Sequence, residues 1–578
     1  MMGDVLVETG GAPIEAPDGH DGDVLRVEDL AVEISGNARL PILKGISFSI
    51  GAGETLCLVG ESGSGKSVTA LSIMGLLPKG ELRASAGRIL LAGEDMLTAS
   101  ANRMRGLRAS SMAMIFQEPM TALNPVLTVG RQIREVLEAH IDVPQQQQRT
   151  RVLDMLAEVQ LPDIERIYSA YPHQLSGGQR QRIMIAMALI LEPKLLIADE
   201  PTTALDVTTQ KQILRLIREL QERHGTSVLF VTHDMGVVAD IATRVAVMHH
   251  GRIVETDATA EILRRPKRDY TRDLLMAVPS LTPRAVRASE SEQIVLATDA
   301  LGKTYSEGSF FGRARKTVAA QDVTLTLKRG RTLGIVGESG SGKSTVARCV
   351  TRLIEPTSGG IRVRDQEISG LSRAELRPHR QHIQMIFQDP YRSLNPRVTV
   401  GESIAEGPVN FGTPHKAALA KARELLELVG LPPDATLRYP HQFSGGQRQR
   451  IAIARALAIA PEVLVADEAV SALDVSVQAQ VLALLGQLQR RLGIAILFIT
   501  HDLRVAAQIC DDVAVMQNGR IVEYGPAEQV LRHPTQIYTR ELIDAAPGRD
   551  WDFANFRPLD ADAIAPRYPR ESGDPVND

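Results

Sequence analysis

The sequence predicts an α/β protein built from two tandem phosphate-binding domains, and three observations support this fold class. The octapeptide GESGSGKS occurs twice, at Gly60–Ser67 and at Gly337–Ser344. Each copy lies between an apolar, strand-like run and a helix-compatible run. The same further motifs then follow each copy in the same order. Self-similarity of this kind indicates a duplicated domain.

The first octapeptide has the pattern of a phosphate-binding loop. The run Thr55–Val59 suits a buried strand, and Val68–Leu77 suits a helix. Glycines let backbone N–H groups curve around a phosphate, and the start of a helix adds partial positive charge. Lys66 could then reach the β- and γ-phosphates of a nucleotide, and Ser67 could bind Mg²⁺. One such match can arise by chance, but two matches in the same strand–loop–helix context leave chance little room.

The second copy repeats this arrangement with the strand-like run Thr332–Val336 and with Lys343. The offset between the repeats is 277 residues at the loop lysines, Lys66 and Lys343, and 268 residues at two late histidines, His233 and His501. Order is therefore kept while spacing drifts by only a few residues, which is typical of a duplicated domain.

Two carboxylates end an apolar run in each repeat. The runs read KLLIADE and EVLVADE, and they end at Glu200 and Glu468. An apolar run of this length suits a buried parallel strand that delivers both acids to its carboxyl edge. We expect Asp199 and Asp467 to hold Mg²⁺, directly or through water. Glu200 and Glu468 would act as general bases for the attacking water.

The tetrapeptide SGGQ occurs in both repeats, at Ser176–Gln179 and Ser444–Gln447. It precedes the helix-compatible stretches Gln181–Leu191 and Gln449–Ile459. A serine followed by glycine N–H groups at the start of a helix can bind an anion. Each repeat therefore has two predicted anion sites.

Each repeat resembles the ATPase domain of an ABC transporter. The resemblance rests on the series of phosphate loop, Gln loop, SGGQ signature, Asp-Glu pair, ALD segment and late His. It implies two tandem ABC-type P-loop nucleotide-binding domains, each with a RecA-like core, an antiparallel β subdomain and an α-helical subdomain. The expected order is a disordered tail over 1–22, domain 1 with a C-terminal arm over 23–281, a linker over 282–292, domain 2 with its arm over 293–548, and a disordered tail over 549–578.

The resemblance also assigns roles to single residues. His233 and His501 would contact the γ-phosphate and orient water, which makes them catalytic beside Glu200 and Glu468. Tyr305 stands where the family stacks an aromatic ring on adenine. The expected Mg²⁺ ligands are Ser67, Gln117, Asp199, Ser344, Gln388 and Asp467. The expected ATP-binding residues are Gly60, Glu61, Ser62, Gly63, Ser64, Gly65, Lys66, Ser67, Gln117, Ser176, Gly177, Gly178, Gln179, Tyr305, Gly337, Glu338, Ser339, Gly340, Ser341, Gly342, Lys343, Ser344, Gln388, Ser444, Gly445, Gly446 and Gln447.

In the ABC family, the phosphate loop of one domain and the signature of the other close on the same ATP. The resemblance therefore pairs Lys66 with Ser444, and Lys343 with Ser176. Because both repeats keep every motif, we expect two hydrolytic sites.

The repeats are not identical. Ile34 stands where the second repeat has Tyr305, and Met187 stands where it has Arg455. The segment DEPTTALD becomes DEAVSALD. These are the positions at which unequal behaviour of the two sites should be sought.

Two local features resemble the ATPase subunits of oligopeptide, dipeptide and nickel importers, here fused in one chain. The strings Phe116–Pro125 (FQEPMTALNP) and Phe387–Pro396 (FQDPYRSLNP) follow each Gln, and the arms Arg265–Pro279 and His533–Pro547 follow each domain. The insertion Ser306–Lys316 resembles one of the two ATPase types in such systems. Solvated helical hairpins with no recognition role are the plainer interpretation of the arms, but the arms recur at a shared offset of 268 residues, which favours a shared structural role.

This resemblance implies the energy-coupling subunit of an importer. ATP-driven closure of the halves would drive two separate integral-membrane permease subunits, and the chain would lie peripherally at the cytoplasmic face of the inner membrane. An extracytoplasmic solute-binding protein would deliver the solute, which would not touch this chain.

Composition agrees with this expectation. The net charge of −4 gives no electrostatic reason to expect a nucleic-acid partner. The longest apolar stretches are about half of what a bilayer crossing needs. The three cysteines, Cys57, Cys349 and Cys510, form no C-x-x-C pair, so we expect reduced core thiols. Neither arm contains a cysteine, and no iron–sulfur cluster is expected there.

Other functions stay open at this point. A ribosome-associated tandem ABC protein would carry a long charged helical linker, unlike Thr282–Glu292. A sugar-importer ATPase would usually show one altered signature, and a drug exporter would lack the FQ-x-P-x-x-x-LNP strings. A tandem ABC ATPase of another importer or exporter, or a soluble non-transport ABC protein, remains the alternative.

Overall fold

The structure is a computed structural model that describes residues 22–36, 40–118, 122–203, 205–285, 291–307, 315–471 and 473–559. By contacts the chain divides into two compact units. Unit 1 comprises residues 1–203 and 213–272, and unit 2 comprises residues 204–212 and 273–578.

Unit 1 is organised around a six-stranded sheet in the order β10-β9-β3-β8-β7-β6. The strands β3 and β7 are buried along their whole length, as strands covered on both faces must be. Five neighbouring strands, β6, β7, β8, β3 and β9, run parallel to one another, and β10 pairs antiparallel with β9. The strands are β3 (Thr55–Val59), β6 (Met112–Ile115), β7 (Leu195–Asp199), β8 (Ser227–Thr232), β9 (Arg244–His249) and β10 (Arg252–Ala258).

A second, antiparallel sheet of unit 1 has the order β2-β1-β4-β5. Buried and exposed residues alternate along β2, as they do in a strand with one face in the core. One apolar core joins this sheet to β3, β7, β8 and helix α1 (Lys66–Ile73). The strands are β1 (Asp23–Ile34), β2 (Pro41–Gly51), β4 (Leu82–Leu91) and β5 (Glu94–Asp95).

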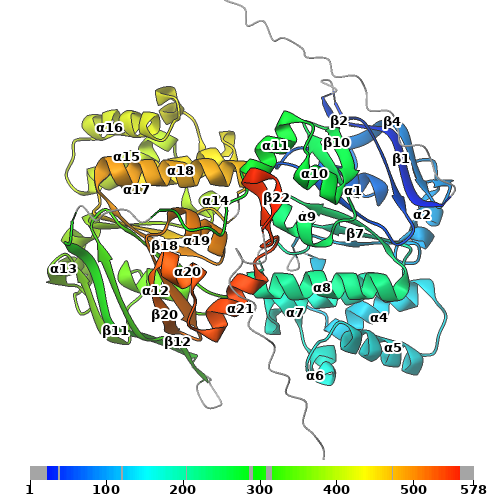
Figure 1. The fold of residues 1–578 in the computed structure, drawn as a ribbon, viewed down its shortest axis with the longest axis horizontal. Helices are drawn as coiled ribbons and strands as arrows, with labels where there is room; N and C mark the ends of the chain where they lie inside the picture. Colours follow the sequence, from blue (N-terminus) through cyan, green and yellow to red (C-terminus); the bar gives the residue numbers. More distant parts are fainter. Residues whose placement is uncertain are drawn as a thin grey trace, which may run out of the picture. The chain divides into compact units, whose positions relative to one another are not determined.

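Helices α4 (Val129–His140), α5 (Gln145–Glu158) and α6 (Ile164–Ser169) pack on one another and form a separate helical part of unit 1, away from β1 and β2 in Figure 1. The other helices of this half of the chain are α2 (Ala101–Leu107), η1 (Pro172–Gln174), α7 (Gly177–Leu189), α8 (Val207–His224), α9 (Met235–Ile241), α10 (Thr259–Arg264) and α11 (Asp269–Met276).

Unit 2 repeats this architecture with sheets in the orders β16-β17-β18-β13-β19-β20 and β12-β11-β14-β15. Its strands are β11 (Ile294–Glu307), β12 (Arg315–Lys328), β13 (Thr332–Val336), β14 (Ser358–Val363), β15 (Gln366–Glu367), β16 (Ile383–Ile386), β17 (Val463–Asp467), β18 (Ala495–Thr500), β19 (Asp512–Gln517) and β20 (Arg520–Pro526).

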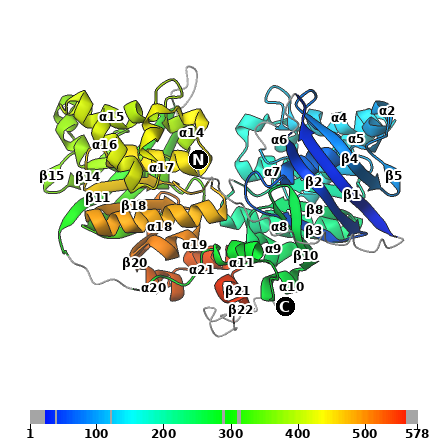
Figure 2. The ribbon, with the colours of Figure 1, turned by 90° about the horizontal axis from the view of Figure 1, so that it is seen from above.

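The helical part of unit 2 contains α15 (Val400–Asn410) and α16 (His415–Leu428), which lie side by side on the opposite side of the unit from α20 (Ala527–Arg532) in Figures 1 and 2. The other helices are α12 (Lys343–Val350), α13 (Arg373–Leu376), η2 (Arg377–Gln381), α14 (Pro390–Ser393), η3 (Pro433–Leu437), η4 (Pro440–Gln442), α17 (Gly445–Leu457), α18 (Val475–Leu492), α19 (Leu503–Ile509) and α21 (Ile537–Ala545). The predicted combination of a P-loop core, an antiparallel sheet and a helical part is therefore present twice.

Three helices, α1, α7 and α17, begin and end at different residues than the sequence suggested; α17 begins at Gly445, four residues early, as α7 does. Helix α1 begins at Lys66, two residues earlier, because Gly65 takes a left-handed conformation that opens the helix. It ends before Gly75, which has φ +63°. Helix α7 begins four residues early, at Gly177, because the side chain of Ser176 caps it.

The structure describes part of the expected C-terminal tail but almost none of the expected N-terminal tail. Residues 1–21, most of the expected N-terminal tail, lie outside the described residues. In the expected C-terminal tail, β21 (Trp551–Asp552) pairs with β22 (Arg557–Pro558) around η5 (Phe553–Asn555), and Phe553 is buried. Residues 560–578, the central part of the insertion (308–314) and linker residues 286–290 also lie outside the described residues.

Candidate functional site

The predicted site residues of unit 1 follow four strands of one sheet. The phosphate loop follows β3, Gln117 follows β6, Glu200 follows β7 and His233 follows β8. These strands run parallel and are neighbours in the sheet, so their carboxyl ends lie at one edge. In sheets of this kind, that edge is where ligands bind.

The phosphate loop is packed tightly against the end of β9. A side chain on Gly60 would place its Cβ 2.2 Å from the carbonyl oxygen of Met248, so only glycine fits there. The Lys66 side chain is buried, and its Nζ donates to the carbonyls of Gly60 and Glu61 at 2.7 and 2.9 Å. Backbone contacts therefore hold the lysine across its own loop.

A serine and an aspartate meet beside this lysine. Ser67 Oγ donates to Asp199 Oδ1 at 3.2 Å, and burial raises the pKa of Asp199 to about 6 despite that hydrogen bond. In unit 2, Ser344 Oγ donates to Asp467 Oδ1 at 2.9 Å, and burial raises the pKa of Asp467 as well. A buried carboxylate beside a hydroxyl oxygen is a donor set that suits a hard divalent cation such as Mg²⁺.

Glu200 is held from three sides. Gln117 Nε2 donates to Oε2 at 2.8 Å, Thr203 Oγ1 donates to the same oxygen at 3.0 Å, and His233 Nδ1 lies 3.0 Å from Oε1. The residue has φ +46°, a conformation that is strained for a non-glycine residue. Its backbone N–H still bonds to the carbonyl of Val231 at 2.9 Å. The strained backbone thus turns the carboxylate out of the strand toward the glutamine and the histidine.

Glu200 and His233 each stabilise the charged form of the other. Burial disfavours ionisation of Glu200, but the hydrogen bond and the charge of His233 outweigh burial and lower the pKa of the carboxyl. Burial likewise disfavours the imidazolium of His233, but Glu200 outweighs it and raises the pKa of the ring. The geometry therefore keeps Glu200 ionised, which a proton acceptor requires.

Unit 2 repeats the cluster with one difference. Gln388 Nε2 donates to Glu468 Oε2 at 2.7 Å, and His501 Nδ1 lies 3.5 Å from Oε1. Glu468 has φ +48°. Ser471, which replaces Thr203, donates to the backbone carbonyl of Glu468 at 3.0 Å and not to its carboxylate. The role of Thr203 is a site feature that the sequence comparison did not single out, although the change from TTALD to VSALD contained it.

The signature serines begin helices, as expected. Ser176 Oγ accepts from the N–H of Gln179 at 3.3 Å, and Gln179 Oε1 accepts from the N–H of Ser176 at 3.0 Å. The same reciprocal capping box joins Ser444 and Gln447. These contacts fix the N-termini of α7 and α17 in a form that can bind an anion.

The position at which the sequence predicts adenine stacking can be compared in the two halves. Asp29 and Ala300 both have φ +45°, which supports the alignment of Ile34 with Tyr305. Both side chains are 39% exposed. Lys303 Nζ lies 5.2 Å from the centre of the Tyr305 ring. The ring predicted to stack on adenine is therefore accessible in unit 2, and an accessible isoleucine stands at the aligned position in unit 1.

The LNP strings after each Gln are held differently in the two units. In unit 1, Gln132 Nε2 donates to the carbonyls of Asn124 and Leu127 at 3.1 and 3.0 Å. The aligned residue in unit 2 is Ser403, which is too short for these bonds, and Arg455 instead donates to the carbonyl of Ser393. This gives a physical account of the change from Met187 to Arg455.

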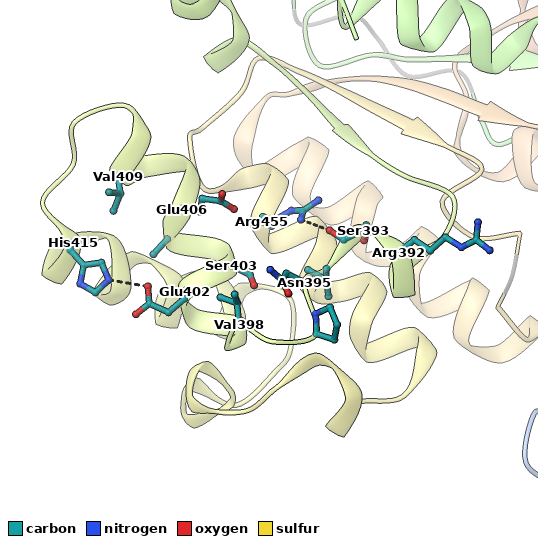
Figure 3. A pocket seen from close by; sticks show the side chains of 13 residues that line it. Arg392, Ser393, Asn395, Val398, Glu402, Ser403, Glu406, Val409, His415 and Arg455 are labelled. Atoms are coloured by element: carbon teal, nitrogen blue, oxygen red, sulfur yellow. Dashed lines mark hydrogen bonds and ion pairs between the residues drawn. The ribbon is translucent and has the colours of Figure 1, made fainter. Parts of the chain in front are cut away.

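A cavity of about 630 Å³ lies at this place in unit 2. Figure 3 shows Arg455 beside Ser393, with Glu406 close to it, and Glu402 beside His415.

Both C-terminal arms reach the phosphate loop of their own unit. The hydroxyl oxygen of Tyr270 on α11 accepts from the N–H of Glu61 at 3.2 Å. The hydroxyl oxygen of Tyr538 on α21 accepts from the N–H of Glu338 at 3.1 Å. The sequence placed the arms at a shared offset but did not indicate these contacts.

The three cysteines are buried and unbridged, as predicted. Burial raises the pKa of each thiol, that of Cys349 to about 11. Within the described part of the chain, no helix is long and apolar enough to cross a bilayer.

Comparisons with known proteins agree with the motifs. The chain matches the ABC transporter family over residues 43–203 and 320–471. It also matches the oligopeptide/dipeptide transporter C-terminal region over residues 254–313 and 522–557, which contain the two arms.

The curated relatives share almost the whole length of the chain. The glutathione import ATP-binding protein GsiA of Escherichia coli strain K12 is 47% identical over 559 residues, which cover 91% of this chain and 90% of that protein. The same protein from Shigella dysenteriae serotype 1 has the same identity and coverage. The peptidoglycan transport ATP-binding protein YejF of Agrobacterium fabrum is 47% identical over 531 residues, which cover 90% of this chain and 96% of that protein.

Proposed function

We propose that this chain, which belongs to the ABC transporter family as an ATPase with two tandem domains, drives a separate membrane importer for peptides or related small solutes. One observation carries the proposal. In each unit, the carboxyl edge of the parallel sheet gathers the loop lysine, a serine–aspartate pair and a carboxylate held between glutamine and histidine. The match to the oligopeptide/dipeptide transporter C-terminal region and the names of the relatives support peptide-type solutes.

The chain's own residues supply most of the chemistry of hydrolysis. The N–H groups of the phosphate loop and Lys66 would bind the β- and γ-phosphates. Glu200, kept ionised, would accept the proton of the attacking water, while His233 and Gln117 orient the water and the γ-phosphate. Ser67 and Asp199 would hold Mg²⁺, with Gln117 as a further ligand, and the ion would neutralise charge that develops on the phosphate oxygens.

The second site would use the equivalent groups of unit 2: Lys343, Ser344, Asp467, Glu468, Gln388 and His501. By analogy with the family, the signature of the opposite repeat would complete each site. Ser444 would then serve the ATP held by Lys66, and Ser176 the ATP held by Lys343. ATP binding would favour the closed arrangement of the halves, and hydrolysis would release it.

An importer ATPase of this family works on membrane permeases, and we propose two permease subunits as the direct partners. Their cytoplasmic segments would dock on the helical part of each unit, near the LNP strings that follow Gln117 and Gln388. The cavity beside Arg455 and Glu406 offers both charges to such a segment (Figure 3). The chain would lie at the cytoplasmic face of the inner membrane, and an extracytoplasmic binding protein would deliver the solute.

Reconstitution tests the proposal. The chain is purified with its two cognate permease proteins and placed in proteoliposomes together with the cognate binding protein. We expect ATP hydrolysis that is stimulated by the loaded binding protein and uptake of a small peptide such as glutathione.

A chain that hydrolyses ATP at the same rate with and without the permease, and that sediments with ribosomes, would instead support a soluble ABC protein. ATP hydrolysis that couples to uptake of a sugar or to export would favour another transporter class.

A further inference from the structure

We propose that Tyr270 and Tyr538 are positioning residues that set the phosphate-loop lysine of their own unit for ATP binding. The inference rests on the proposed ATP site and adds a role for the two arms. It assigns to each arm a direct contact with the nucleotide-binding loop through one hydroxyl group.

The contact acts on a single peptide group. The carbonyl of Gly60 and the N–H of Glu61 belong to the same planar peptide unit and point in opposite directions. The Tyr270 hydroxyl binds the N–H end at 3.2 Å, and Lys66 Nζ binds the carbonyl end at 2.7 Å. Hydrogen bonds at both ends of one amide polarise each other. The tyrosine therefore fixes the plane of the amide against which the lysine is held.

Unit 2 shows the same chain of contacts. The Tyr538 hydroxyl binds the N–H of Glu338 at 3.1 Å, and Lys343 Nζ binds the carbonyl of Gly337 at 2.7 Å. Burial raises the pKa of Tyr538 to about 12, so its hydroxyl stays protonated and neutral near pH 7. Because the tyrosine–loop contact has the same geometry in both units, it is unlike a chance packing contact.

Each arm is itself anchored, so the hydroxyl has a fixed position. Glu255 on β10 is buried and accepts from the N–H groups of Lys267 and Arg268 at 2.8 and 3.2 Å, just before α11 begins. Glu523 on β20 accepts from the N–H groups of Thr535 and Gln536 at 2.7 and 3.3 Å, just before α21. A buried or half-buried carboxylate thus holds the start of each arm helix to the sheet that carries the phosphate loop.

The surroundings of the two tyrosines differ in one respect. The ring of Tyr270 stacks on His249 with centroids 3.9 Å apart, whereas the aligned residue in unit 2 is Gln517. The ring packing is therefore specific to each unit, while the hydroxyl contact with the loop is common to both. A Tyr→Phe change separates the two features, because it keeps the ring and removes the hydroxyl.

The test uses the full chain with Tyr270→Phe, Tyr538→Phe and both changes together. Tyr524→Phe is the matched control, because the hydroxyl of Tyr524 donates to the carbonyl of Thr326 at 3.2 Å in the antiparallel sheet. The measurements are the Kd of Mg·ATP, the KM and kcat of ATP hydrolysis, the Tm without nucleotide, and deuterium exchange of the phosphate-loop amides.

We expect the Kd and KM of the double variant to rise roughly three- to tenfold, the change that one lost hydrogen bond produces. The kcat should stay within about twofold, because the lysine binds the phosphates in both ground and transition states. Exchange at the amides of Glu61 and Glu338 should become faster, the Tm should fall by no more than a few degrees, and the Kd and KM of the control variant should stay at the wild-type values.

A Kd within twofold of the wild-type value would overturn the inference, as would an equal rise in Tyr524→Phe. If the wild-type chain itself fails to bind Mg·ATP, the proposed function fails. If the wild-type chain binds and the double variant binds equally well, only the role of the tyrosines fails.

Discussion

Replacement of Glu200 and Glu468 by glutamine tests whether both sites hydrolyse ATP. Glutamine keeps the size of the side chain, and its amide oxygen can still accept a hydrogen bond. It cannot take a proton from water. In unit 1 this removes a carboxylate that Gln117 and Thr203 hold at 2.8 and 3.0 Å and whose pKa the nearby His233 lowers. In unit 2 it removes the equivalent carboxylate beside Gln388.

The expected loss of ATPase rate follows from the role of these glutamates as general bases. A positioned general base contributes about 10²- to 10⁴-fold to a rate. Each single variant therefore silences its own site, and the chain keeps about half of its ATPase rate if the two sites turn over independently. Coupled sites would leave less than half. The double variant should lose at least about 100-fold.

Phosphate release by the full chain, with its permeases, is the assay. Nucleotide binding to each variant serves as the control, since Glu→Gln removes no group that we place on the phosphates. A single variant that keeps the full wild-type rate would refute the two-site reasoning. In unit 2, Ser471 bonds to the backbone carbonyl of Glu468 and not to its carboxylate. If the two sites hydrolyse ATP at different rates, we therefore expect the site that uses Glu468 to be the slower one.

Three further predictions concern the differences between the halves and the core. Thr203→Ala removes one hydrogen bond to the Glu200 carboxylate; in the Glu468→Gln background, where only the Glu200 site turns over, it should lower kcat several-fold with little change in the KM for ATP, whereas Ser471→Ala in the Glu200→Gln background should leave kcat nearly unchanged. Arg455→Met removes the bond to the Ser393 carbonyl and should lower the free energy of unfolding of unit 2 by about 1 kcal/mol. Adding Ser403→Gln should restore part of that loss in chemical denaturation, because it recreates the glutamine of unit 1. The thiolate is the reactive form of cysteine and burial raises all three thiol pKa values, so at pH 8 a thiol reagent should label none of them in the folded chain and all of them after denaturation: Cys57, Cys349 and Cys510. Fast labelling of the folded chain would contradict the burial of these thiols.

Much of the fold could be predicted from local signals. The strands β3 and β13 have the bounds that their apolar runs suggested, because a short run buried on both faces has a sharp end in sequence. The starts of α1 and α7 were misplaced. A left-handed Gly65 and the capping box of Ser176 decide those starts, and both depend on backbone conformation that apolar periodicity does not report.

The arms show the limit of the same reasoning. Their recurrence indicated a shared structural task, but not that Tyr270 and Tyr538 reach the phosphate loops. These contacts join residues 209 and 200 positions apart. Likewise, no pattern in one repeat could show that the segment after the Gln is bonded by Gln132 in unit 1 and by Arg455 in unit 2, since the two residues lie on different helices.

The sequence by itself determined which groups are present, in what order and in how many copies. Two phosphate loops, two Asp-Glu pairs and two SGGQ segments are local patterns, and each needs only its neighbours to be recognised. Tertiary structure decided what those groups touch. The left-handed turn at Glu200, the bonds from Gln117 and His233, and the hydroxyl of Tyr270 on the phosphate loop depend on strands and arms that meet only after folding.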